Sequence, residues 1–258
     1  MKVLKYPSNS QLGLPTPRFN GFNPQVIQFL EDIKQNNNKK WFDEHYDFYQ
    51  QEILEISRDL VEALGGALQE IAPGINVVPK VNGSIYRFSR DARFSKDKTP
   101  YKTHISYLFW QGMLKRTRCP GFYLAFRPEY IQIGVGINHF TPEYLQAWRE
   151  QCAQTDKDQK IHDIMTKLKQ NGIIMHGEQL KRLPRGFSHK NPDELINADL
   201  ICYKGLKCWF QMPLPKQLFN AEFIPWCMQY YEQLLPLFDW MVEVMSHFKV
   251  EVDFSGQP

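Results

Sequence analysis

The sequence predicts an α+β fold in which a largely antiparallel central sheet packs against helices, with helices at both ends of the chain. Towards each end, apolar residues recur three or four positions apart, which is the spacing of a helix with one buried face. The middle of the chain holds short runs of β-branched and aromatic residues that are separated by glycine, proline or charged residues, as in strands joined by turns. Because the elements are grouped rather than strictly alternating, the pattern favours α+β over a parallel α/β fold.

Two helices are expected first. Asn23 before Pro24 is typical of a helix start, and the asparagines at 36–38 are expected to end that helix. A second, longer helix should begin at Lys39, with the pair Gly65-Gly66 weakening it and Pro73-Gly74 stopping it. We expect these two helices to pack as a hairpin.

Four strands should follow, over residues 83–88, 103–110, 121–127 and 130–137. The short break Arg127-Pro128-Glu129 predicts an antiparallel hairpin between the third and the fourth of them. In the fourth, Gly134 and Gly136 indicate close packing or a bulge rather than a phosphate-binding turn.

The remaining elements are three helices and one more strand. Thr141-Pro142 predicts a helix up to about Cys152, and another helix should lie between residues 157 and 171. A strand over 205–213 and a last helix over 221–248, kinked at Pro236, complete the chain. We expect a mobile arm over residues 1–18 and a single α+β domain over 19–258, since no repeat or low-complexity linker divides the chain.

Composition excludes several classes of protein. With 258 residues, of which 43% are hydrophobic and 23% charged, the chain is unlike collagenous, disordered or disulfide-scaffold proteins. No signal peptide or membrane span is predicted, and the five cysteines include no C-x-x-C pair. We therefore expect a cytoplasmic protein with reduced thiols and no membrane partner, while its oligomeric state stays open.

The charge is distributed unevenly. The whole chain carries a net charge of only +3, but ten basic and two acidic residues lie between Lys80 and Arg118. That segment therefore carries +8 and the rest of the chain −5. A local cationic site within a mildly acidic fold is what this distribution predicts.

An arginine-rich motif lies in the middle of the basic segment. It reads R-x-x-R-D-x-R-F, followed by an Asp-Lys pair and a tyrosine; the fixed positions are Arg87, Arg90, Asp91, Arg93, Phe94, Asp97, Lys98 and Tyr101. Here the chain resembles a widely distributed bacterial family defined as a domain of unknown function, DUF2461. A looser resemblance extends over most of the chain, including the segment LKRLPRGF at 180–187. The resemblance implies a shared fold but no established activity.

The spacing of the motif suggests how its charges are arranged. On an extended segment Arg87, Asp91 and Arg93 would point to one face and Arg90 to the other. Six cations between residues 87 and 102 outnumber the two carboxylates by four. Such a cluster forms either a closed salt-bridge network or an under-neutralised site that attracts an anion.

Our leading hypothesis is a domain that binds a phosphate- or carboxylate-bearing ligand. The expected ligand-binding residues are Arg87, Arg90, Asp91, Arg93, Asp97, Lys98 and Tyr101, and a secondary basic cluster comprises Lys181, Arg182 and Arg185. Two alternatives stay open. One is a nucleic-acid-binding module, because aromatic residues interleave with the basic ones, and it is not favoured; the other is a structural salt-bridge cluster in an interaction protein.

The sequence leaves open whether the protein is an enzyme. His104 and Asp91 are the catalytic candidates, because an imidazole or a carboxylate close to the cationic segment could transfer protons. The histidines are scattered and form no H-x-x-x-H or H-E-x-x-H pair, so no metal site is expected. No motif for a cofactor is present either, and we expect none.

Overall fold

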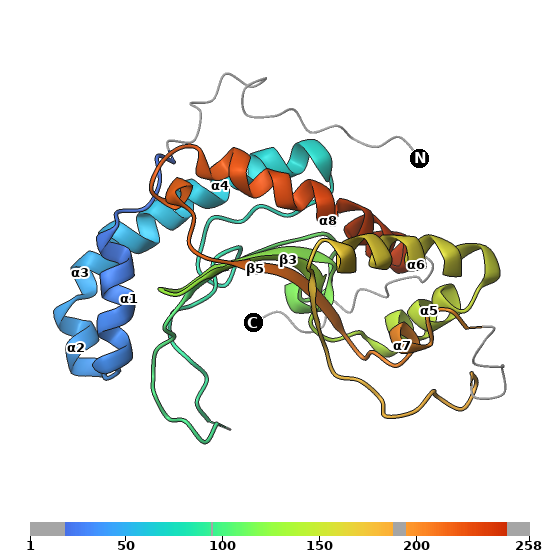
Figure 1. The fold of residues 1–258 in the computed structure, drawn as a ribbon. Helices are drawn as coiled ribbons and strands as arrows, with labels where there is room; N and C mark the ends of the chain where they lie inside the picture. The colour runs from blue at the N-terminus through green and yellow to red at the C-terminus, as the bar shows by residue number, and fades with distance from the viewer. Residues whose placement is uncertain (1–18, 94, 188–194, 247–258) are drawn as a thin grey trace. The chain divides into compact units, whose positions relative to one another are not determined.

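The structure is a computed structural model that describes residues 19–93, 95–187 and 195–246 (Figure 1). Within these residues it confirms the predicted α+β class, with a five-stranded antiparallel sheet and helices towards both ends of the chain. The expected arm over 1–18 and the motif residue Phe94 lie outside the described residues.

The N-terminal helices begin where the sequence predicts, but the second one is divided into several consecutive elements. In α1 (Gln25–Gln35) the Asn23 side chain accepts a hydrogen bond from the first backbone N–H at 3.0 Å, and Asn38 caps α2 (Lys39–Glu44) in the same way. The chain continues through α3 (Tyr46–Phe48), a π-helical segment (Tyr49–Glu55) and α4 (Ile56–Ile71). Phe29 of α1 packs against Trp41 and Phe48, so α1 lies beside α2 and α3 (Figure 1).

α4 runs through both Gly65 and Gly66, so this pair does not end the helix. The two glycines also differ in their surroundings. A Cβ atom on Gly65 would lie 2.4 Å from Cγ1 of Val77, whereas one on Gly66 would meet no atom within 4 Å. Gly65 is therefore required by close packing rather than by the end of a helix.

The sheet contains three of the four strands expected in the middle of the chain. It has the order β1-β2-β3-β5-β4 and comprises β1 (Ile105–Trp110), β2 (Gly121–Phe126), β3 (Ile131–Ile137), β4 (Ile174–His176) and β5 (Leu206–Met212). β2 and β3 are neighbours, and the Arg127 N–H donates to the Tyr130 carbonyl at 3.0 Å in the turn that joins them. The predicted hairpin is therefore present.

The strand expected over residues 83–88 is absent from the described residues. Ile85 pairs with Tyr107 of β1 only through an isolated bridge. The backbone N–H groups of Gly83, Ser84 and Ile85 instead donate to carbonyls of residues 78–80, which forms a compact turn. Hydrogen bonds within the turn thus replace those of a longer ladder.

The second half of the chain follows its predicted helices closely. α5 (Pro142–Cys152) begins with the Thr141 hydroxyl accepting from a backbone N–H at 3.2 Å, and α6 (Thr155–Gln170) follows it. The last helix, α8 (Phe223–Ser246), continues through Pro236. The three-residue strand β4 and the short helix α7 (Ala198–Ile201) are not predicted from the sequence.

The chain groups into two compact units. Unit 1 contains the described residues up to Phe109 together with 123–133 and 211–231; unit 2 contains 110–122, 134–210 and the described residues from 232 onwards. Strands β1, β2, β3 and β5 and helix α8 contribute residues to both units. The single domain expected over 19–258 stays a prediction.

The glycines of β3 allow close approach to β5 within unit 2. Cβ atoms on Gly134 and Gly136 would lie 2.5 Å and 2.3 Å from the carbonyl oxygens of Cys208 and Leu206. The interpretation that they serve strand packing is therefore confirmed.

Candidate functional site

The motif residues lie on a loop of unit 1 over residues 87–102, which we call the arginine loop. Its base is closed by backbone hydrogen bonds: the Arg90 N–H donates to the Pro100 carbonyl at 2.7 Å, and the Lys102 N–H donates to the Phe88 carbonyl at 2.9 Å. Ser89 and Tyr101 form an isolated antiparallel bridge between these two bonds. The two ends of the loop therefore have a fixed spacing.

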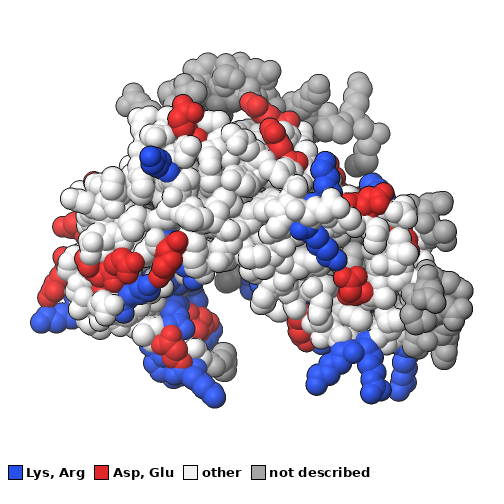
Figure 2. Space-filling model, in the orientation of Figure 1, with Lys and Arg blue, Asp and Glu red and all other residues white. Residues whose placement is uncertain are grey.

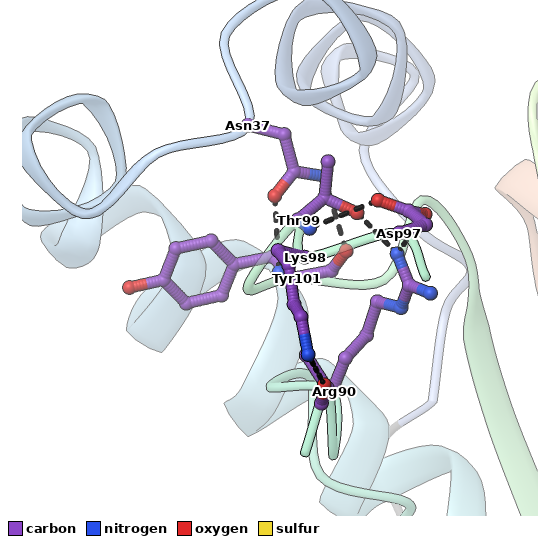
Figure 3. A network of polar contacts seen from close by, with 7 residues as sticks. Asn37, Arg90, Asp97, Lys98, Thr99 and Tyr101 are labelled. Atoms are coloured by element: carbon purple, nitrogen blue, oxygen red, sulfur yellow. Dashed lines mark hydrogen bonds and ion pairs between the residues drawn. The ribbon is translucent and has the colours of Figure 1, made fainter. Parts of the chain in front are cut away.

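Asn37, between α1 and α2, holds the base of the loop from outside (Figure 3). Its side-chain amide donates to the Tyr101 carbonyl and accepts from the Tyr101 N–H, both at 3.0 Å. The expected role of Asn37 was only to end a helix. The run of three asparagines was the available signal, since side-chain amides often bond the backbone of a turn.

Aromatic packing anchors the same base. Phe88 is buried and lies 5.3 Å from Tyr49 and 5.8 Å from Phe42, measured between ring centroids. The Tyr101 ring stacks on Phe42 at 4.2 Å, and partial burial raises the pKa of its hydroxyl. Tyr101, expected among the ligand-binding residues, is thus held in an aromatic cluster.

Three further motif residues bond within the loop (Figure 3). The Arg90 guanidinium pairs with the Asp97 carboxylate and donates to the Thr99 hydroxyl. Hydrogen bonds from the Thr99 backbone N–H and from Arg90 lower the pKa of Asp97 to about 2. The Lys98 ammonium donates to the carbonyls of residues 92 and 93 at 3.0 and 3.3 Å. Arg90, Asp97 and Lys98 therefore stabilise the loop conformation.

A second group forms around Asp91. Arg93 donates to this carboxylate through Nε at 2.9 Å and Nη2 at 2.7 Å, and Arg87 Nη2 lies 3.8 Å from it. The hydrogen bonds from Arg93 lower the pKa of Asp91 to about 2, with the charge of Arg87 acting in the same direction. One carboxylate therefore faces two guanidinium groups, and the outer side of the loop keeps a positive charge.

The structure reproduces the expected division of the arginines. Arg87 and Arg93 converge on Asp91, whereas Arg90 turns to Asp97. The side chains of Arg87 and Arg93 are 49% and 77% exposed, and that of Arg90 is 27% exposed. Figure 2 shows basic side chains crowded together with acidic ones over this loop.

Several aromatic residues described in the basic segment are engaged in packing. Phe88, Tyr107 and Phe109 are buried in the core of unit 1. The Lys102 ammonium covers the ring of Tyr86 at 5.1 Å from its centroid. These residues contribute to packing within unit 1, and nucleic-acid binding stays a prediction.

The two catalytic candidates occupy different surroundings. With a pKa of about 2, Asp91 is a weak proton acceptor at neutral pH. His104 is partly exposed, and its pKa is lowered to about 4 by burial first and then by the charges of Arg127 and Lys102. The cations that act on His104 are thus not those gathered around Asp91.

The secondary basic cluster belongs to unit 2. Lys181, Arg182 and Arg185 are exposed on the loop that follows β4. The arginine loop belongs to unit 1, so joint action of the two clusters stays a prediction.

Two further kinds of feature, a metal site and a membrane-spanning helix, are absent from the described ranges. No three His, Cys, Asp or Glu side chains there come together as a metal site, and no helix is long and apolar enough to cross a membrane. All five cysteines are unpaired.

Comparison with known protein families finds a match over most of the chain. A family described as "Conserved hypothetical protein (DUF2461)" matches residues 25–240, a range that includes the arginine loop. No curated protein matches the chain.

Proposed function

The chain belongs to the DUF2461 family, whose description names no activity, and we propose that it binds a small anionic ligand on the outer side of the arginine loop. The ligand carries a phosphate or carboxylate group. The proposal rests on Arg87: its exposed guanidinium donates no hydrogen bond to any residue that the structure describes, and the nearest carboxylate, of Asp91, is 3.8 Å away.

The neighbours of Arg87 support this assignment. Arg93 is fixed by its two hydrogen bonds to Asp91, which orients a second guanidinium beside the first. Lys96 is exposed, and among the described residues it has neither a hydrogen-bond partner nor an ion-pair partner. An incoming oxyanion would therefore meet one guanidinium, that of Arg93, which is already oriented, and this lowers the entropic cost of binding.

Fewer residues are proposed to contact the ligand than the sequence suggested, because some of them bond within the loop. Arg90, Asp97 and Lys98 bond to other parts of the loop, so they support the site from within. Arg87, Arg93 and Lys96 remain as the contact residues. The unpaired cysteines also fit the cytoplasmic location that we propose for the protein.

Binding of defined anions tests the proposal directly. Inorganic phosphate, pyrophosphate, citrate and a short oligonucleotide are titrated into the full chain at low and high salt, with calorimetry and thermal shift as readouts. Arg87→Ala should weaken binding of the best small anion by about tenfold or more, as expected for a lost charge-assisted contact. Arg58→Ala is the matched control, because Arg58 is an exposed arginine of α4 that pairs with Glu55.

Each outcome has a defined meaning. Binding that is retained by Arg58→Ala and weakened by Arg87→Ala supports the proposal. Binding of the oligonucleotide alone, with a steep loss of affinity at high salt, would instead support a nucleic-acid interface and refute the small-anion site. If no probe binds, the loop is a structural salt-bridge cluster.

A further inference from the structure

The sheet of unit 1 presents one face to helices and a different, polar face on its other side. On β1 the buried Tyr107 hydroxyl hydrogen-bonds Ser57 of α4 at 2.7 Å, and on β2 Phe126 packs against Phe22 with ring centroids 5.0 Å apart. Side chains alternate along a strand, so residues an odd number of positions from Tyr107 on β1 or from Phe126 on β2 point to the other face of the sheet. Ser106 and Tyr123 are therefore on the opposite face.

Polar and cationic groups gather on this opposite face. The side chains of Tyr123 and Ser106 are hydrogen-bonded, and Tyr86 lies edge-on to Tyr123 at 6.5 Å between ring centroids. Lys102 covers the Tyr86 ring, which brings its ammonium to the same patch. His104 directly precedes β1, and the charges of both Lys102 and Arg127 act on its imidazole.

Arg127 completes the group at the end of β2. Its guanidinium lies over the ring of Tyr130 at 4.8 Å. Its Nε is buried and has no hydrogen-bond acceptor in the part of the chain that the structure describes. A buried donor without an acceptor is costly and rare in folded proteins, and a ligand that supplies the acceptor would remove that cost.

The electrostatics of His104 also suit a ligand. Burial, Arg127 and Lys102 together hold the pKa of the imidazole at about 4, so it is uncharged at neutral pH. An uncharged imidazole can accept a hydrogen bond from a hydroxyl group at one nitrogen. Lys102 and Arg127 would attract the negative oxygens of an oxyanion, and the imidazole would accept a hydrogen bond from a protonated oxygen of the same ligand.

We propose that Lys102, His104 and Arg127 form a second anion site, on the sheet face away from α4, for a small oxyanion that keeps a proton at neutral pH, such as monohydrogen phosphate. Lys102 and Arg127 contact the charged oxygens, and His104 accepts the hydrogen bond of the protonated one. The site does not depend on the ligand proposed for Arg87, because none of its three residues is among Arg87, Arg93 and Lys96.

Nuclear magnetic resonance of the imidazole tests this site. Inorganic phosphate is titrated into the full chain at constant ionic strength and neutral pH while the ring ¹H and ¹⁵N resonances of His104 are followed. A His104→Gln variant identifies those resonances. We expect a saturable shift in the wild type, and the same shift in Arg87→Ala, whose substitution affects only the outer side of the arginine loop.

Two variants of Arg127 complete the experiment. Arg127→Gln should raise the phosphate concentration at half-saturation by about tenfold, whereas Arg127→Lys, which keeps the charge, should lose less. A wild-type protein without a saturable His104 shift would overturn the proposal whether or not the variants fold. A shift that persists in Arg127→Gln but disappears in Arg87→Ala would also overturn it, since the phosphate would then occupy the arginine loop.

Discussion

The environment of His104 makes the stability of the protein depend on pH. In the folded chain its pKa is about 4, against the ordinary value of 6.5. Below pH 6.5 the unfolded chain binds a proton at His104, and the folded chain does not until the pH approaches 4. The free energy of unfolding should therefore fall as the pH decreases from 6.5 to 4. Between pH 7 and pH 5 the loss from this one residue is about 2 kcal/mol.

Comparison of the wild type with a neutral substitution isolates this contribution. Urea unfolding of wild type and His104→Gln is measured at pH 7 and at pH 5 through tryptophan fluorescence. All other titrating groups are present in both proteins, so their contributions cancel in the difference. The wild type should lose about 2 kcal/mol more than the variant between the two pH values.

A second neutral variant, His104→Asn, guards against an effect of side-chain size. Both variants should show the same flattened response to pH, even if their stabilities at pH 7 differ. Parallel responses of wild type and both variants would refute the reasoning, because His104 would then bind its proton equally well in the folded and unfolded chains.

Three further predictions concern the stability of unit 1. Asn37→Ala removes both hydrogen bonds to the backbone of the arginine loop and should lower the free energy of unfolding by about 2 kcal/mol in urea, while an unchanged value would contradict that anchoring role. Gly66→Ala should stabilise the chain by up to about 1 kcal/mol through helix propensity, whereas Gly65→Ala should destabilise it by about 1–3 kcal/mol because of the contact with Val77; calorimetric melting checks this, and equal effects would refute it. The pKa of Asp97 is about 2 in the folded chain, below its ordinary 3.8, so its stabilising effect is complete above pH 3.8 and is lost as the pH falls towards 2. Acid titration followed by circular dichroism should show a shallower loss for Asp97→Asn over that interval, and superimposable curves would exclude the effect.

Sequence patterns predicted the long elements well because each combined a start signal with a buried face. Thr141-Pro142 located the first turn of α5, and the β-branched and aromatic runs located β1, β2 and β3. None of the three residues of β4 is buried, so no run of core side chains marks them as a strand. The close packing of Gly65 was not predicted, because its packing partner, Val77, is brought close only by the folded chain.

The candidate site was only partly predictable, for a related reason. Charge counting located the arginine loop, and the spacing of Arg87, Asp91 and Arg93 anticipated that they would meet. Inside the loop, Lys98 bonds backbone carbonyls and Arg90 bonds Thr99 as well as Asp97. A charge pattern does not predict the carbonyl and Thr99 contacts, because those partners are uncharged. The contact between Asn37 and Tyr101 joins residues 64 positions apart in the sequence, which is beyond the range of local patterns.

That contact also determines which parts of the loop can be altered. The Asn37 side chain bonds the backbone N–H and carbonyl of Tyr101, as a neighbouring peptide unit would. Every amino acid except proline, which lacks the N–H, provides both groups, so these two hydrogen bonds do not depend on the side chain at position 101. The outer residues Arg87, Arg93 and Lys96 contribute nothing to these bonds. Their charges can therefore be exchanged while the supporting structure is kept, which makes the loop a scaffold on which anion preference can be redesigned one side chain at a time.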